Sequence, residues 1–118
     1  MNLDAVMAAH PTLGLYGMSN GQGEDRVALA DSAELVHAVL DWMSQNFRPI
    51  QSINSRWSSY GLKHVVEASM GVYVPNGVFI AAAIGAGYPA RFTDGPNPQF
   101  GISERSIQKA KRLTVNQC

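Results

Sequence analysis

The chain has very little cysteine and no long apolar run, and each absence excludes a class of protein. Cys118 is the only cysteine, so no disulfide and no cysteine-based metal site can form within one chain. No apolar run approaches the roughly 18–20 residues that cross a bilayer. Asp4 precedes every Lys and Arg, so the start lacks the basic segment of a signal peptide. We therefore expect a cytoplasmic protein with no membrane partner.

Motifs for metal binding and catalysis are also missing. His10, His37 and His64 are spaced 27 residues apart, and the sequence contains no H-x-x-x-H or H-E-x-x-H pair. A zinc or iron site needs three or four convergent ligands, so we expect no metal and no cofactor. The Gly-rich segment GMSNGQG lacks the Lys and Ser/Thr of a phosphate-binding loop, and a turn is predicted there instead.

The charges are unevenly distributed along a chain of folding composition. Of the 118 residues, 46% are hydrophobic and 15% charged, which indicates one folded domain over residues 1–118. Residues 1–47 carry six acidic side chains and one basic (net −5), while residues 48–118 carry eight basic and three acidic (net +5). A basic half suits a polyanion, because phosphate neutralisation supplies much of the affinity for nucleic acid. The alternative is that the two halves face each other within the domain.

Caps and apolar spacing predict three helices in the middle of the chain. A helix over Asp31–Asn46 begins with Asp31 and Glu34 as a capping box. A second helix begins at Ser58 or Ser59 and ends at Gly71. A third helix follows Asn76 as its cap, spans Gly77–Ala86 and ends at Gly87. This third helix has no polar side chain, so it must be buried on most sides.

The remaining segments are predicted from turn and cap residues. Residues 47–57 are expected to be extended, and residues 90–92 and 99–102 to form a hairpin around Asp94-Gly95 and two prolines. A last helix begins at Ser103, with Glu104 or Ser106 completing its cap. The first thirty residues predict a helix over 3–9 and a hairpin of 12–17 with 26–30.

This order of elements is that of a winged helix-turn-helix. We therefore predict an α+β fold with a winged helix-turn-helix-like core over residues 31–113 and an N-terminal extension over residues 1–30. Because the 77–86 helix offers no polar side chain to base edges, we do not expect it to read the major groove. The predicted core consists of Leu35, Val39, Leu40, Trp42, Leu62, Val66, Phe79, Ile80, Ile84, Phe92, Phe100 and Ile107.

Two stretches carry candidate binding residues. Hydroxyls and cations at the start of the second helix suit phosphate or acidic side chains. In the last helix, three cations at spacings of four and three form one stripe. The predicted contact residues are Arg56, Ser58, Ser59, Tyr60, Lys63, His64, Arg91, Arg105, Lys109 and Arg112. The alternative is that both are ordinary solvated helix faces. Nothing in the spacing sets a base beside a nucleophile, so no catalytic residue is assigned.

Three motifs of the central segment resemble those of a known family. Ser58–Lys63 with His64 and Glu67 follows SSYxLKHxxE, residues 73–88 follow YxxNGxFIAAAxxAGY, and residues 97–103 follow NxxFxIS. In these the chain resembles small, largely uncharacterised proteins of bacterial phages, prophages and plasmids. The resemblance implies a mobile-element origin, where small proteins bind DNA, repress transcription or disable a host defence complex.

Two functions from different classes therefore remain as hypotheses. The first is a small non-enzymatic recognition protein that binds nucleic acid through the second helix, the hairpin around Arg91 and the basic last helix. The alternative is a protein-binding inhibitor of a host defence complex, of anti-CRISPR or anti-restriction type. It would use the acidic N-terminal part or the face of Tyr60, Lys63 and His64.

Overall fold

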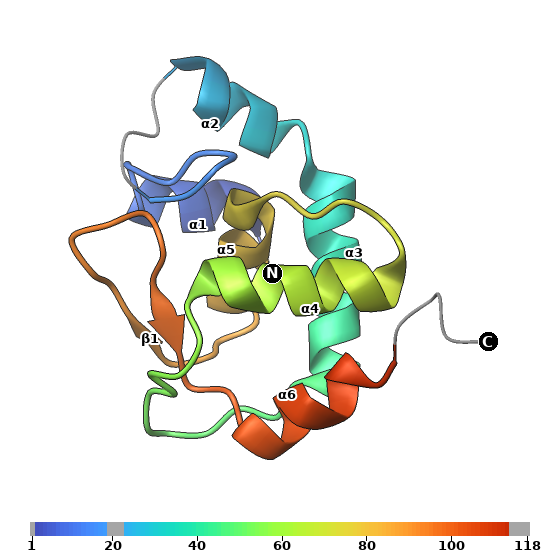
Figure 1. Cartoon of the computed structure of the whole chain (residues 1–118). Helices are drawn as coiled ribbons and strands as arrows, with labels where there is room; N and C mark the ends of the chain where they lie inside the picture. Colours follow the sequence, from blue (N-terminus) through green and yellow to red (C-terminus); the bar gives the residue numbers. More distant parts are fainter. Residues whose placement is uncertain (1, 19–22, 114–118) are drawn as a thin grey trace.

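The chain folds into helices and one small antiparallel sheet, arranged around the helix α5 (Figure 1). The structure is a computed structural model that describes residues 2–18 and 23–113. Its elements in chain order are α1 (Leu3–Ala9), α2 (Gly23–Ala30), α3 (Ala33–Asn46), α4 (Ser59–Met70), α5 (Asn76–Gly85), β1 (Ala90–Arg91), β2 (Gln99–Phe100) and α6 (Glu104–Lys111). The expected α+β class is confirmed.

Helix α5 is buried on almost every side. All its residues from Asn76 to Ala83 are buried, and it packs against α1, α3 and α4. The cause lies in its sequence, since a helix with apolar residues all round is stable in water only when its neighbours cover it. The predicted range of 77–86 is confirmed to within one residue at each end.

The expected cap at Asn76 is wrong. Asn76 is the first helical residue, preceded by Pro75, and its side chain does not cap the helix. The Asn76 amide instead donates hydrogen bonds to the Asn97 Oδ1 (2.8 Å) and to the carbonyl of Tyr16 (3.4 Å). The side chain thus joins two loops, far apart in sequence, to the start of α5.

Helices α3 and α4 lie where the sequence places them, but one cap differs. The Ser58 Oγ accepts a hydrogen bond from the Gly61 N–H at 3.4 Å, and Gly71 ends α4 with a left-handed φ of 75°, as predicted. Helix α3 begins after Ser32, without a side-chain hydrogen bond at its cap. The predicted capping box at Asp31 is therefore wrong.

The expected hairpin in the first thirty residues is also wrong. Helix α1 is confirmed, but residues 23–30 form the helix α2 instead of a strand. Arg26 fixes α2 against α1, because its guanidinium donates hydrogen bonds of 2.9 Å to the carbonyls of Met7, His10, Pro11 and Leu13. Leu29 on α2 is fully buried. Of the turn predicted over residues 19–23, residues 19–22 lie outside the described residues, and Gly23 begins α2.

The hairpin of β1 and β2 is confirmed, although each strand has only two residues. Ala90 pairs with Phe100, and Arg91 pairs with Gln99. The segment before α4, expected to be extended, contributes one isolated bridge, between Pro49 and Ile102. Helix α6 follows Ser103, whose Oγ accepts a hydrogen bond from the Ser106 N–H at 3.2 Å, as its cap residues predict.

The predicted core is largely confirmed. Seven of its twelve members are buried, namely Val39, Leu62, Val66, Phe79, Ile80, Phe100 and Ile107. Four more, Leu35, Leu40, Trp42 and Ile84, are partly buried and pack against it. Phe92 is wrong, since it is 45% exposed on the hairpin. The N-terminal part contributes its own buried residues, among them Leu3, Val6, Leu13 and Leu29.

A buried tyrosine connects the segment after α5 to the end of α3. The Tyr88 hydroxyl lies 2.9 Å from the Met43 carbonyl and 2.6 Å from the Phe47 carbonyl, so it can donate to either. Burial raises the pKa of Tyr88 to about 12, because the phenolate is poorly solvated there. The hydroxyl thus stays protonated as a donor to the carbonyls at the end of α3.

Gly77→Ala should destabilise the protein by about 3 kcal/mol, although alanine favours helix. A Cβ at Gly77 would overlap the Gly14 carbonyl oxygen, because the Gly77 N–H already donates to the Leu15 carbonyl at 2.7 Å. Gly95→Ala is the matched control, since its Cβ would meet nothing closer than the Thr93 Oγ1 at 4.0 Å. Urea unfolding measures both. Wild-type stability in Gly77→Ala would contradict this packing.

Candidate functional site

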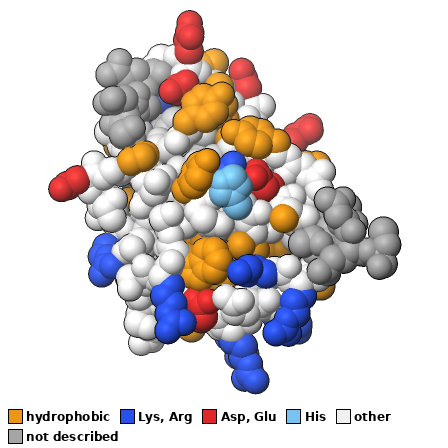
Figure 2. Space-filling view, viewed as in Figure 1, with side chains coloured by type: hydrophobic (Ala, Val, Ile, Leu, Met, Phe, Trp, Pro, Cys, Tyr) orange, Lys and Arg blue, Asp and Glu red, His pale blue; other side chains and the backbone are white. Residues whose placement is uncertain are grey.

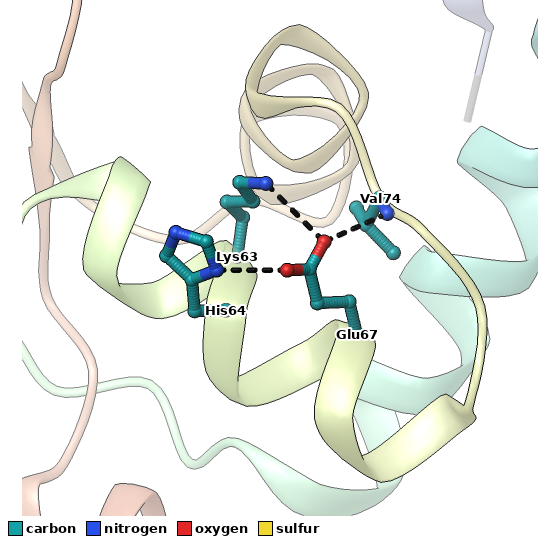
Figure 3. Close-up of polar contacts among 4 residues, drawn as sticks. All are labelled: Lys63, His64, Glu67 and Val74. Carbon is teal, nitrogen blue, oxygen red and sulfur yellow. Dashed lines mark hydrogen bonds and ion pairs between the residues drawn. The ribbon is translucent and has the colours of Figure 1, made fainter.

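Helix α4 carries a cluster of polar contacts centred on Glu67 (Figure 3). Glu67 Oε1 accepts from the Lys63 ammonium at 3.2 Å and from the Val74 backbone N–H at 3.0 Å. Glu67 Oε2 lies 2.7 Å from the His64 Nδ1. The carboxylate thus joins two residues of α4 to the segment that leads into α5.

Two predicted contact residues, Ser59 and Lys63, are buried instead of accessible. Lys63 is only 4% exposed, because its ammonium is paired with Glu67 and lies near the rings of Tyr60 (5.3 Å) and Tyr73 (4.7 Å). Ser59 is fully buried, with its N–H donating to the Pro98 carbonyl at 2.9 Å. The expectation that these two side chains lie on an open binding surface is therefore wrong.

The surroundings of Glu67 favour its charged form. Burial alone would raise the pKa of this carboxyl, but the hydrogen bonds from Val74, His64 and Lys63 and the charge of Lys63 outweigh burial and lower the pKa below its usual value. Glu67 therefore remains ionised at neutral pH, and the ammonium of Lys63 keeps its partner.

Aromatic side chains cover the outer side of this cluster. Tyr60 and Tyr73 are 52% and 63% exposed, and the His64 side chain is 49% exposed. Tyr60 and His64 lie edge to face, with ring centroids 4.6 Å apart. We call Tyr60, Tyr73 and the exposed Val72 the tyrosine patch. In Figure 2, several hydrophobic side chains are visible along this face, next to the His and Glu side chains at its centre.

A hollow of about 360 Å³ lies beside the patch. It is lined by Trp57, Gly61, His64, Val65, Ala68 and Lys111. The Trp57 indole N–H donates to Glu104 Oε1 at 2.9 Å, and the Lys111 ammonium lies 5.5 Å from the indole centroid. We call this the Trp57 hollow. It combines an aromatic ring with one exposed cation, Lys111.

A second hollow, of about 420 Å³, lies on the other flank of α6 and is polar. Its described lining residues are Gln45, Asn46, Arg48, Ser103, Arg105, Ser106 and Lys109, and none of them is acidic. Arg48, Arg105 and Lys109 are all exposed. We call it the basic hollow. Three cations around one concave surface can bind an anion such as a phosphate.

The ten predicted contact residues therefore separate into several places. Arg105 and Lys109 line the basic hollow, and Arg112 is exposed one turn further along the chain. His64 lines the Trp57 hollow, and Tyr60 packs against His64. Arg91 bonds to the Gln99 side chain, whose amide donates to the Ser55 carbonyl, so Arg91 lies near the segment of exposed Arg56. Ser58 is the helix cap.

Among the described residues, the acidic and basic parts of the chain form no ion pair with each other. In residues 2–18 and 23–113, the ion pair between a Lys or Arg and a carboxylate is that of Lys63 with Glu67, within α4. The His64 Nδ1 also lies 2.7 Å from Glu67 Oε2. Figure 2 shows Lys and Arg side chains gathering over the half of this face around α6, while Asp and Glu lie mostly nearer to α2.

Arg48, Trp57 and Lys111 line the hollows but were not among the predicted contact residues. In the sequence, Arg48 and Lys111 add only to the net charge of the basic half. Trp57 is only the residue before the helix cap, Ser58. Their placement depends on contacts distant in sequence, such as the hydrogen bond from the Arg48 N–H to the Ser106 Oγ at 3.1 Å. Only the basic charge of Arg48 and Lys111 was a usable signal.

Within the part of the chain that the structure describes, no three His, Cys, Asp or Glu side chains converge as a metal site would require. In the same residues, no helix is long and apolar enough to cross a membrane. Cys118 lies outside the described residues. Comparison with models of protein families, with curated proteins and with solved structures finds no match.

Glu67→Gln should lower the free energy of unfolding at pH 7 by roughly 2–3 kcal/mol, since it leaves the buried Lys63 ammonium without a counter-charge. A lowered folded pKa means that this stability is present above the unfolded pKa of about 4.3 and is lost as the pH falls through the lower folded pKa. Wild type and variant should therefore converge in stability at acid pH.

Urea unfolding between about pH 3 and pH 7 measures this. Glu34→Gln makes the same chemical change at an exposed position of α3 and should shift stability by less than about 0.5 kcal/mol. Equal losses in the two variants at pH 7 would refute the role given to the Glu67 carboxylate.

Proposed function

We propose that this protein binds nucleic acid, chiefly through phosphate contacts made by its basic half. The observation that carries the proposal is the basic hollow, where Arg48, Arg105 and Lys109 surround one concave surface whose described lining includes no acidic residue. Lys and Arg that neutralise phosphates supply the sequence-independent part of nucleic-acid affinity. The resemblance to proteins of phages and plasmids agrees with such a role.

The order of elements supports a winged-helix-like core in this proposal. Helices α3, α4 and α5 are followed by the β1–β2 hairpin, and the Pro49–Ile102 bridge stands where the short first strand of a winged helix would lie. In the usual docking mode the last of the three helices enters the major groove. Here that helix is α5, which is covered by its neighbours. Contacts to phosphates, with little discrimination between duplex sequences, are therefore the mode proposed.

Neutralising the basic hollow should weaken binding to every duplex sequence alike. The triple variant Arg48→Gln, Arg105→Gln, Lys109→Gln should reduce the log–log dependence of affinity on salt by about 2–3 units, because each phosphate that is no longer neutralised removes about 0.9 from the slope. Fluorescence anisotropy with a labelled mixed-sequence duplex at several salt concentrations measures this slope.

The control is a triple variant of the acidic part, Glu24→Gln, Glu34→Gln, Asp41→Asn, whose residues are all exposed. It should keep the wild-type slope. An unchanged slope in the basic-hollow variant would remove this surface from the interface. A wild-type dissociation constant weaker than about 10 μM near 100 mM salt would rule out the function.

A second candidate is a protein-binding inhibitor of a host defence complex, of anti-CRISPR or anti-restriction type. The tyrosine patch favours it, because exposed tyrosines beside an apolar residue are typical anchors of protein interfaces. Tyr60→Ala with Tyr73→Ala should then abolish inhibition of a purified effector nuclease, while Phe92→Ala, an exposed aromatic of the hairpin, should not. Absence of inhibition by the wild type would exclude this candidate.

A further inference from the structure

A hydrogen bond at the edge of the Trp57 indole holds the ring in position. Its N–H donates to Glu104, and this carboxylate also accepts from the side-chain amides of Asn54 (3.0 Å) and Gln108 (2.7 Å). On the other side, Gly61 lets the ring approach α4, because a Cβ there would lie 3.2 Å from the Trp57 Cε3. The ring is therefore oriented before any partner binds.

The rest of the Trp57 hollow suits a flat, uncharged group joined to an anion. Val65 and Ala68 contribute apolar surface from α4, and His64 contributes a second ring. Lys111 and the nearby Arg56 are exposed cations at this end of the molecule. Hydrogen bonds from Gln108, Asn54 and Trp57 and the charge of Arg56 lower the pKa of Glu104, so this carboxylate stays ionised at the indole edge. The charge of Arg56 partly offsets its repulsion of an anion.

We infer that the Trp57 hollow holds one unpaired base of a single-stranded nucleic acid, which stacks on the indole in place of the Lys111 ammonium while that ammonium moves to the phosphate. This inference rests on the proposed function and specifies its substrate class. Aromatic rings that stack bases beside cations that follow the backbone are the common solution for single strands. The base of a duplex cannot enter the hollow without being unpaired, which costs a few kcal/mol.

The charge around the hollow favours a nucleotide over an apolar side chain of a protein. A protein aromatic would stack on the indole but would bring no negative charge to the exposed Lys111 ammonium. A nucleotide satisfies both requirements. The two hollows lie on opposite flanks of α6, with Lys109 at one and Lys111 at the other, so a strand that crosses α6 reaches both.

Ala68→Leu tests the inference by filling the hollow without disturbing its walls, since Ala68 is exposed on α4. The probe is a fluorescein-labelled mixed-sequence single-stranded DNA of about 16 nucleotides, with the corresponding duplex alongside. Single-strand affinity should fall about tenfold or more, and duplex affinity should change less than about twofold. Ala38→Leu, on the exposed side of α3, is the matched control and should leave both affinities unchanged.

A second readout uses the indole itself. In a Trp42→Phe background, Trp57 is the only tryptophan, because the chain has two. Unlabelled single strand should quench its fluorescence, and Ala68→Leu should abolish the quenching. Undiminished single-strand affinity in Ala68→Leu would overturn the inference and leave the proposed function standing. No binding of either probe by the wild type would overturn both.

Discussion

Burial of α5 is the constraint on which the rest of this structure depends. A helix made almost wholly of Gly, Ala and large apolar residues has to be covered, and α1, α3 and α4 cover it. Its small residues allow close approach, as where the Gly77 N–H meets the Leu15 carbonyl. The segment before α2, the hairpin and the C-terminal helix are then placed around this centre, and the polar side chains are left to the outer elements.

The same constraint limits where the proposed recognition can occur. Because the one polar side chain of α5, that of Asn76, is buried, we do not propose that α5 reads bases in the manner of a recognition helix. The accessible chemistry lies instead on α4, on α6 and on the segment before α4. There Lys63, a predicted contact residue, is buried in an ion pair with Glu67. The cations that remain exposed are Arg48, Arg105, Lys109 and Lys111. The proposed phosphate contacts and base stacking use this surface.

Local signals predicted most of the fold, and distant contacts account for the misses. The caps at Ser58, Ser103 and Gly71 and the apolar spacing of α3 to α5 are properties of short segments, so the sequence alone predicts them. Helix α2 was missed because its position depends on Arg26 reaching the end of α1. Local sequence also placed Phe92 in the core, but the two-residue strands leave it at the surface.

The candidate site was predictable only in its charge. The basic half follows from a count, but which cations share a hollow depends on Arg48 meeting α6 across 58 positions of sequence. The i, i+4 spacing of Lys63 and Glu67 predicts their pairing. The burial of Lys63 depends on residues beyond the end of α4, where the Tyr73 ring lies near the ammonium and the Val74 N–H donates to Glu67. Trp57 is likewise held beside the candidate site by its hydrogen bond to Glu104, 47 positions away in sequence.

The most direct test of this account is an amide and indole NMR titration with single-stranded DNA. The account predicts the largest shifts at the Trp57 indole and at the backbone amides of Arg48, Arg105 and Lys109, with α5 from Val78 to Ala83 unaffected. Shifts concentrated in α1 and α2, or in α5, would contradict it.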